Sequence, residues 1–147
     1  MKYSKKEIEK NNRLIAEFMG WKEKESGYYP ISVIKIVDEY QIDDDCENYH
    51  GQYVGDLPLK VYHISWDWLM PVVDKIENIF KTKGFLQKFE INSHFVSLRM
   101  PVGPIIKVGC YKTSTEKIKF NSKIEAVYCV VVEFIKYYNN YYSIVKF

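Results

Sequence analysis

Apolar residues recur at helical spacing in three segments of the chain. The first begins after Ser4 and Glu7, whose S-x-x-E spacing is typical of a capping box at a helix start. Gly20 can adopt the left-handed conformation that ends a helix. The predicted apolar face of this helix consists of Ile8, Ile15, Phe18 and Met19.

The second helical pattern follows Ser65, a good N-cap residue, with Asp67 in the first turn, where a negative charge faces the positive helix end. Gly84 is placed to end it. Pro71 removes an amide donor, so either the early part is kinked or residues 65–70 form a separate turn. The predicted apolar stripe along one face of this helix consists of Leu69, Val72, Val73, Ile76, Ile79 and Phe80.

The third helical pattern begins at Ser122 and Glu125, which repeat the capping-box spacing. Residues 130–132 are three valines with strand propensity, but the cap and the length of the pattern favour a helix. Its stripe consists of Ile124, Val127, Tyr128, Val131, Phe134, Ile135 and Tyr138.

Three apolar runs, residues 85–91, 95–100 and 105–111, are separated by connections too short for a helical crossover, so they predict an antiparallel meander. Residues 59–63 predict another short strand. The expected fold class is α+β: a mainly antiparallel sheet with three helices packed on it, in an αβα sandwich-like arrangement.

Residues 22–60 are the least regular part of the chain, with one apolar stretch, residues 31–42, that suits a strand. We interpret this part as a long insertion within a single domain of residues 1–147. Five tyrosines gather in it, and tyrosine is favoured at recognition surfaces because it offers contact area at low entropic cost. They are Tyr28, Tyr29, Tyr40, Tyr49 and Tyr53.

Charge and cysteine usage exclude several classes. The net charge is +2, and the only arginines are Arg13 and Arg99, which disfavours sequence-specific nucleic-acid recognition. The three cysteines are far apart and form no C-x-x-C pair, so no disulfide framework or zinc site is expected. The polar N-terminus and the short apolar runs predict a cytoplasmic protein without a membrane segment.

His63, Ser65 and Trp66 fall where the strand expected over residues 59–63 meets a helix start, whose free amides attract anions. A phosphate-bearing ligand would bind there with Trp66 or Trp68 stacked on a base. The alternative is that Ser65 and Asp67 cap the helix while His63 and the tryptophans pack. Together with Tyr49 and Tyr53, the residues His63, Ser65 and Trp66 form the candidate ligand-binding set.

Residues 43–47 contain four carboxylates, but they lack the alternating pattern and the distal glutamate of a calcium loop. Cys46 and His50 suggest a nucleophile and base, without the nucleophile elbow or oxyanion loop that would support them. We therefore expect no catalytic residue, no metal ligand and no cofactor. Glu125 and Glu133 are interpreted as a capping residue and a polar-face residue.

Four segments together resemble one family: NRLIAEFMG (residues 12–20), YHISWDWLMPVV (62–73), KIEAVY (123–128) and VEFIKYYN (132–139). The chain is similar to short uncharacterised proteins of Bacteroidetes and their phages or prophages, related to the phage ABA-sandwich domain. The resemblance implies a sheet between helices and a phage or mobile-element setting. It implies no catalytic residues.

The sequence and this resemblance lead us to expect a non-enzymatic accessory binding protein in the cytoplasm of a bacterial host. The most specific version of this expected function is a counter-defence protein that sequesters a host ligand such as a nucleotide signal. Two alternatives remain: a structural or protein-interaction module that docks on a host or virion protein, and a small hydrolase that uses Cys46, His50 and the acidic residues 43–47. A homo-oligomer is compatible with all three.

Overall fold

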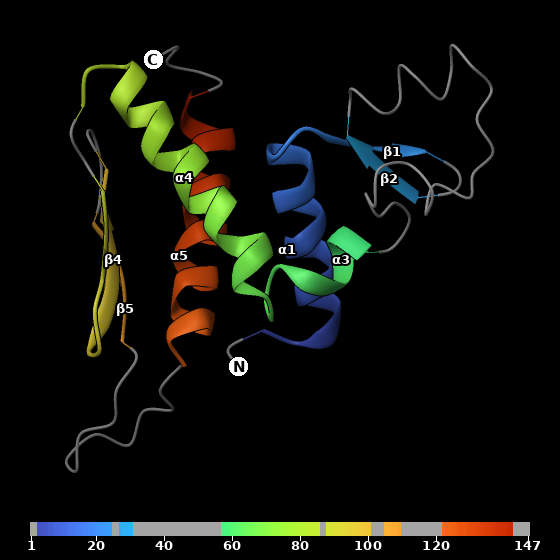
Figure 1. Cartoon of the computed structure of the whole chain (residues 1–147), viewed down its shortest axis with the longest axis horizontal. Helices are drawn as coiled ribbons and strands as arrows, with labels where there is room; N and C mark the ends of the chain where they lie inside the picture. The colour runs from blue at the N-terminus through green and yellow to red at the C-terminus, as the bar shows by residue number, and fades with distance from the viewer. Residues whose placement is uncertain are drawn as a thin grey trace.

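The computed structural model of the chain describes residues 3–24, 27–30, 57–85, 88–100, 105–109 and 122–142 (Figure 1). The element order begins with a helix and a hairpin, continues with two helices and a meander, and closes with a helix that ends in a π-helical turn. The elements are α1 (Lys5–Phe18), β1 (Trp21–Lys24), β2 (Gly27–Pro30), α3 (Leu57–Val61), α4 (Trp66–Thr82), β3 (Phe89–Ile91), β4 (Phe95–Arg99), β5 (Ile105–Gly109), α5 (Lys123–Tyr137) and the π-helical turn (Tyr138–Tyr142).

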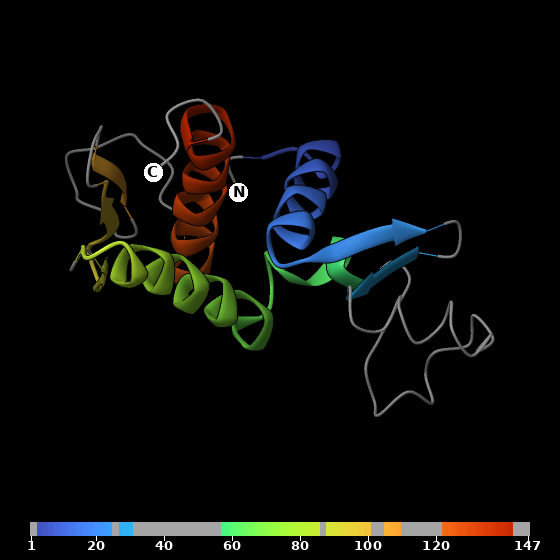
Figure 2. The same cartoon turned by 90° about the horizontal axis from the view of Figure 1, so that it is seen from above.

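The described elements form layers. The sheet β3–β4–β5 lies against α5, α4 crosses α5, and α1 with α3 lies beyond them, as Figure 1 and Figure 2 show. The prediction of an α+β fold with helices packed on an antiparallel sheet is confirmed. The described helices lie on one side of this sheet, whereas the resemblance implies a sheet between helices.

Helix α1 starts and ends as the sequence predicts. Ser4 Oγ accepts from the Glu7 amide at 3.3 Å and Glu7 Oε2 accepts from the Ser4 amide at 2.8 Å, which completes the capping box. Gly20 has a φ of 87°, the left-handed conformation expected at the stop. No basic residue lies in the last turn of α1, but Lys75 of α4 donates its Nζ to the Phe18 carbonyl oxygen there.

Helix α4 runs continuously through Pro71, so residues 65–70 do not form a separate turn: Ser65 is the N-cap and residues 66–70 belong to the helix. At its end the Phe85 amide donates to the Phe80 carbonyl at 2.8 Å and the Gly84 amide donates to the Lys81 carbonyl at 3.1 Å. With Gly84 at a φ of 83°, these two bonds form a Schellman motif. The expected glycine stop is confirmed.

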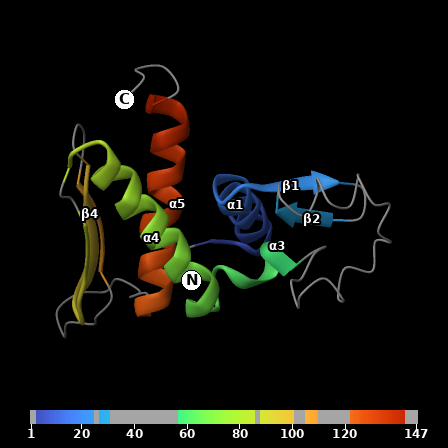
Figure 3. The ribbon, with the colours of Figure 1, turned by 45° about the horizontal axis from the view of Figure 1, so that its top comes forward.

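The strand expected over residues 59–63 is wrong, because Leu57–Val61 form the short helix α3. A short apolar run does not distinguish a strand from a buried helical turn. Pro58 fits the first turn of a helix, where its missing amide donor has no intrahelical partner to lose. Figure 3 shows α3 beside α1, and this packing decides the conformation.

The antiparallel meander is confirmed, with β4 in the middle and Leu98 opposite both Phe89 and Ile106. Val96 and Leu98 of β4 point into the core. The first strand is shorter than expected, because Phe85 belongs to the end of α4 and the strand begins at Phe89.

Helix α5 is the centre of the core. The Ser122 hydroxyl accepts from the Glu125 amide at 3.3 Å, so the predicted cap is confirmed. All seven side chains from Ala126 to Val132 are fully buried, since β4 and β5 cover one side of α5 and α1 and α4 cover others. Packing therefore overrides the strand propensity of the three valines.

The part expected to be irregular contains the hairpin β1–β2, in which Trp21 pairs with Pro30, and the helix α3. The strand expected over residues 31–42 lies outside the described residues. Among the described helices, none is both long and apolar enough to cross a bilayer.

Candidate functional site

The turn between α3 and α4 carries three of the five candidate residues, His63, Ser65 and Trp66. Its backbone is held by its own hydrogen bonds: the amides of Ile64 and Ser65 both donate to the Val61 carbonyl, at 3.1 and 3.0 Å. The Ser65 carbonyl then accepts from the Leu69 amide at 3.0 Å and starts α4. The backbone of this turn is therefore fixed, and with it the positions from which its side chains project.

Ser65 stands at the N-cap of α4 with extended backbone angles, but its hydroxyl makes no capping hydrogen bond. The expected side-chain cap is wrong at this helix, in contrast to Ser4 and Ser122. The exposed carboxylate of Asp67 lies in the first turn, where its negative charge complements the helix dipole. Asp67 also repels an anion that approaches the same amides.

His63 points inward and packs. Its Nδ1 lies 3.0 Å from Asn12 Nδ2, and its ring centroid lies 6.0 Å from that of Tyr128. Burial lowers the pKa of His63 below its ordinary value of 6.5. The ring is held between α1 and α5, so the packing interpretation of His63 is the one the contacts support.

The tryptophans of α4 divide between the two interpretations. Trp68 is half-buried, with its ring 5.9 Å from those of both Tyr62 and Trp21. Trp66 is 39% exposed, and the neighbouring Ile64 is 66% exposed. Of the two tryptophans in α4, therefore, Trp66 is the one whose ring is accessible to a ligand.

Asn12, which sequence reasoning missed, holds the junction of three helices. Its Nδ2 donates to the Leu59 carbonyl of α3 at 2.7 Å, and its Oδ1 accepts from the Tyr128 hydroxyl of α5 at 2.9 Å. We call Asn12, His63, Tyr128 and the Leu59 carbonyl the Asn12 junction. A fully buried amide on the apolar face of a helix must be paired, and this position in the Ile8–Ile15 stripe was the available signal.

Asn11, the preceding residue, is also buried on α1, and within the described part of the chain its Nδ2 has no hydrogen-bond partner. Nothing in the described contacts explains this polar group in the core.

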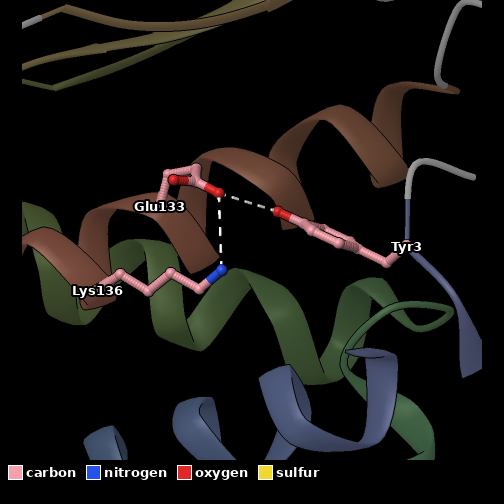
Figure 4. Close-up of polar contacts among 3 residues, drawn as sticks. All are labelled: Tyr3, Glu133 and Lys136. Atoms are coloured by element: carbon pink, nitrogen blue, oxygen red, sulfur yellow. Dashed lines mark hydrogen bonds and ion pairs between the residues drawn. The ribbon is translucent and has the colours of Figure 1, made fainter. Parts of the chain in front are cut away.

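A second polar cluster ties the N-terminus to α5. The Tyr3 hydroxyl donates to Glu133 Oε1 at 3.2 Å, and Lys136 Nζ lies 3.9 Å from the same carboxylate (Figure 4). Burial, together with the neighbouring Glu133 carboxylate, raises the pKa of Tyr3, so its phenol remains a neutral donor. Glu133 therefore acts as an anchor for residue 3. The bond at Ser122 comes from the Glu125 backbone amide, so the capping role predicted for the Glu125 side chain stays a prediction.

Within the described residues, no three His, Cys, Asp or Glu side chains gather as metal ligands would. Cys129 is buried in α5. Tyr49, Tyr53, Cys46, His50 and the acidic residues 43–47 lie outside the described residues. Of the candidate residues, the structure places only His63, Ser65 and Trp66, on one turn but with His63 packed inward and Trp66 exposed.

Comparisons of the chain with protein-family models, with curated proteins and with solved structures find no match.

Proposed function

We propose that the chain is a non-enzymatic binding protein whose ligand surface is the turn between α3 and α4, with Trp66 as its main contact. The observation that carries this proposal is the exposure of Ile64 and Trp66, 66% and 39%, on a turn fixed by its own backbone bonds. Large apolar side chains that lie next to each other on a surface with a fixed backbone are typical of recognition sites.

A nucleotide is the ligand that we infer from this surface and from the setting. An exposed indole stacks on a base of any identity, which contributes about 1–3 kcal/mol for each base. The Ser65 hydroxyl makes no capping bond, so a bond to the ligand would not cost a cap. Because Asp67 stands in the same turn, we expect stacking on Trp66 to contribute more than phosphate binding at the amides.

The setting in this proposal rests on the resemblance to small phage and prophage proteins of Bacteroidetes. In that setting the chain acts in the host cytoplasm as a counter-defence protein and sequesters a nucleotide signal without converting it. Tyr49 and Tyr53 precede α3 in the sequence and are proposed to complete the surface.

A thermal-shift screen against mononucleotides, cyclic nucleotides and dinucleotides tests the proposal. Each nucleotide is recovered afterwards, and its mass is measured by mass spectrometry. We expect one nucleotide to raise the Tm and to be recovered intact. At 100 times its Kd it should add about 2.7 kcal/mol to the free energy of unfolding.

The matched variants are Trp66→Ala, which should weaken binding at least tenfold, and Asn78→Ala, which changes an exposed residue of α4 and should bind like the wild type. Tyr49→Ala and Tyr53→Ala should weaken binding as well. Conversion of the nucleotide, or equal affinity of the wild type and the Trp66→Ala variant, would contradict the proposal.

The second candidate function is docking on a host or virion protein, which Ile64 favours because a 66% exposed isoleucine beside a tryptophan suits a protein surface better than a base. Baits of the wild type and of Ile64→Asp, compared in host lysate, test it. A protein retained by the wild type and lost from Ile64→Asp, with no nucleotide shifting the Tm, would replace the first candidate by the second.

A further inference from the structure

The Asn12 junction fixes which atoms of its amide face which neighbours. The Leu59 carbonyl, 2.7 Å away, accepts hydrogen bonds only, so the group beside it must be the Nδ2 donor. The Tyr128 hydroxyl, 2.9 Å from Oδ1, then donates to the amide oxygen. The Leu59 carbonyl therefore determines the orientation of this fully buried side chain, and the Tyr128 hydroxyl, which can donate or accept, is compatible with it.

This orientation determines the protonation of His63. The amide nitrogen of Asn12 has two hydrogens: one points to the Leu59 carbonyl, and the other points to His63 Nδ1 at 3.0 Å. His63 Nδ1 must accept this second hydrogen and cannot carry a proton of its own. The ring is therefore neutral, with its proton on Nε2.

We propose that His63 is an acid-sensitive latch, which joins α1, α3 and α5 as the neutral Nε2–H tautomer and opens their junction when it is protonated. A proton on Nδ1 places two donors 3.0 Å apart, so the contact with Asn12 becomes repulsive. This repulsion is relieved only if His63 or Asn12 moves away. Asn12 cannot turn without losing its bonds to Leu59 and Tyr128, so His63 is the residue that moves. The device goes beyond the proposed binding function and does not depend on it.

Among the described residues, the groups around the ring offer the imidazolium no compensation. Asn12 of α1 and the Leu59 carbonyl of α3 do not titrate, and the phenol of Tyr128 on α5 is neutral because burial raises its pKa. Within the described residues no carboxylate pairs with His63. Desolvation lowers the pKa of His63, in the direction that the geometry requires.

The pH window follows from the direction of this pKa change. Above about pH 6.5 the ring is neutral in both the closed and the opened state, so the latch is fully effective. As the pH falls below 6.5 the opened state binds a proton first, and the closed state loses population until the pH reaches the lowered pKa of His63. Over that window the opening constant should rise by up to about tenfold for each pH unit.

The part that opens is α3 with its turn, because His63 lies on this turn and moves away from Asn12 while Asn12 stays held by Leu59 and Tyr128. Helix α5 stays closed, since sheet and helices bury it completely from Ala126 to Val132. The amides of Ile64 and Ser65, which donate to Val61, should then exchange with solvent faster than those of α5.

The test uses the intact chain, with hydrogen exchange measured between pH 7.5 and pH 5 and corrected for intrinsic rates, and with the imidazole nitrogens followed by NMR. We expect His63 to be an Nε2–H tautomer at pH 7.5, and acid to accelerate exchange in α3 while α5 remains protected. In His63→Asn the amide oxygen takes the place of Nδ1 as acceptor and does not titrate, so this acceleration should disappear. His94→Asn, at the exposed turn between β3 and β4, should keep it.

Asn12→Asp should have the opposite effect on His63. A carboxylate beside the ring favours the imidazolium and should raise the pKa of His63 above its value in the wild type. If this variant does not fold, the wild-type measurements still decide. An Nδ1–H tautomer at pH 7.5, exchange in α3 that acid does not change, or unaltered acid acceleration in His63→Asn would each overturn the proposal.

Discussion

Phe134 is the residue whose removal should test the architecture most severely. Its side chain is fully buried in α5, and its ring lies edge-on to Phe18 of α1 at 6.2 Å and to Phe80 of α4 at 5.5 Å. It also stacks on Tyr138 of the π-helical turn at 5.7 Å. One ring therefore joins three helical segments of the core.

Phe134→Ala should lower the free energy of unfolding by about 4–5 kcal/mol, the upper part of the usual range for a buried phenylalanine. We expect the upper part of this range because the substitution leaves a cavity and also removes three aromatic contacts. Each such contact contributes about 0.5–1.5 kcal/mol beyond the buried area. Phe134→Leu keeps most of the volume and should cost about 1.5 kcal/mol.

Guanidinium denaturation followed by far-UV circular dichroism measures both changes, with unchanged m-values as the sign of a common unfolding reaction. Asn78→Ala on the exposed face of α4 is the control and should stay within about 0.5 kcal/mol of the wild type. Lys136 is a poorer control, because its Nζ lies 3.9 Å from Glu133 and over the Tyr3 ring. A Phe134→Ala variant within about 1 kcal/mol of the wild type would refute the packing of α5.

Two further perturbations test the polar contacts. Tyr128→Phe should cost about 1–3 kcal/mol in thermal or chemical unfolding, because Asn12 Oδ1 is then buried without its donor; a neutral effect would show that this bond is absent. Ser122→Ala should cost about 1 kcal/mol and Ser65→Ala clearly less, since only the Ser122 hydroxyl accepts a capping bond; equal losses in the same unfolding experiment would contradict this difference.

Helix limits were largely predictable, because the residues that set them act locally. Ser4 with Glu7, Ser122 with Glu125, and the stops at Gly20 and Gly84 mark helix ends where the structure has them. The connection at Asn92 is equally local, since its Oδ1 accepts from the amides of His94 and Phe95.

The conformation of residues 57–61 was not predictable in this way. Leu59, Val61 and Tyr62 suit a strand or a buried turn of helix, and α1 selects the helix through packing and through the bond from Asn12 to Leu59. Ser65 has the right residue type for a cap, but its hydroxyl makes no capping bond. Residue type predicts that a cap is available and leaves open whether it is used.

The candidate site shows the same division between local and tertiary information. The sequence indicated His63, Ser65 and Trp66 as neighbours, which their spacing guarantees. It left Trp66 and Trp68 equivalent, and only the contacts of Trp68 with Tyr62 and Trp21 separate the packed ring from the exposed one.

The ligand surface at the turn between α3 and α4 is tested most directly by the indole resonances of the three tryptophans during titration with the nucleotide panel. Trp21 and Trp68 pack against each other, while Trp66 is 39% exposed, so the protein contains its own controls. We predict that a nucleotide recovered intact shifts the Trp66 indole signal far more than those of Trp21 and Trp68. A panel in which no nucleotide moves the Trp66 signal, or in which the nucleotide is consumed, would contradict the proposed function.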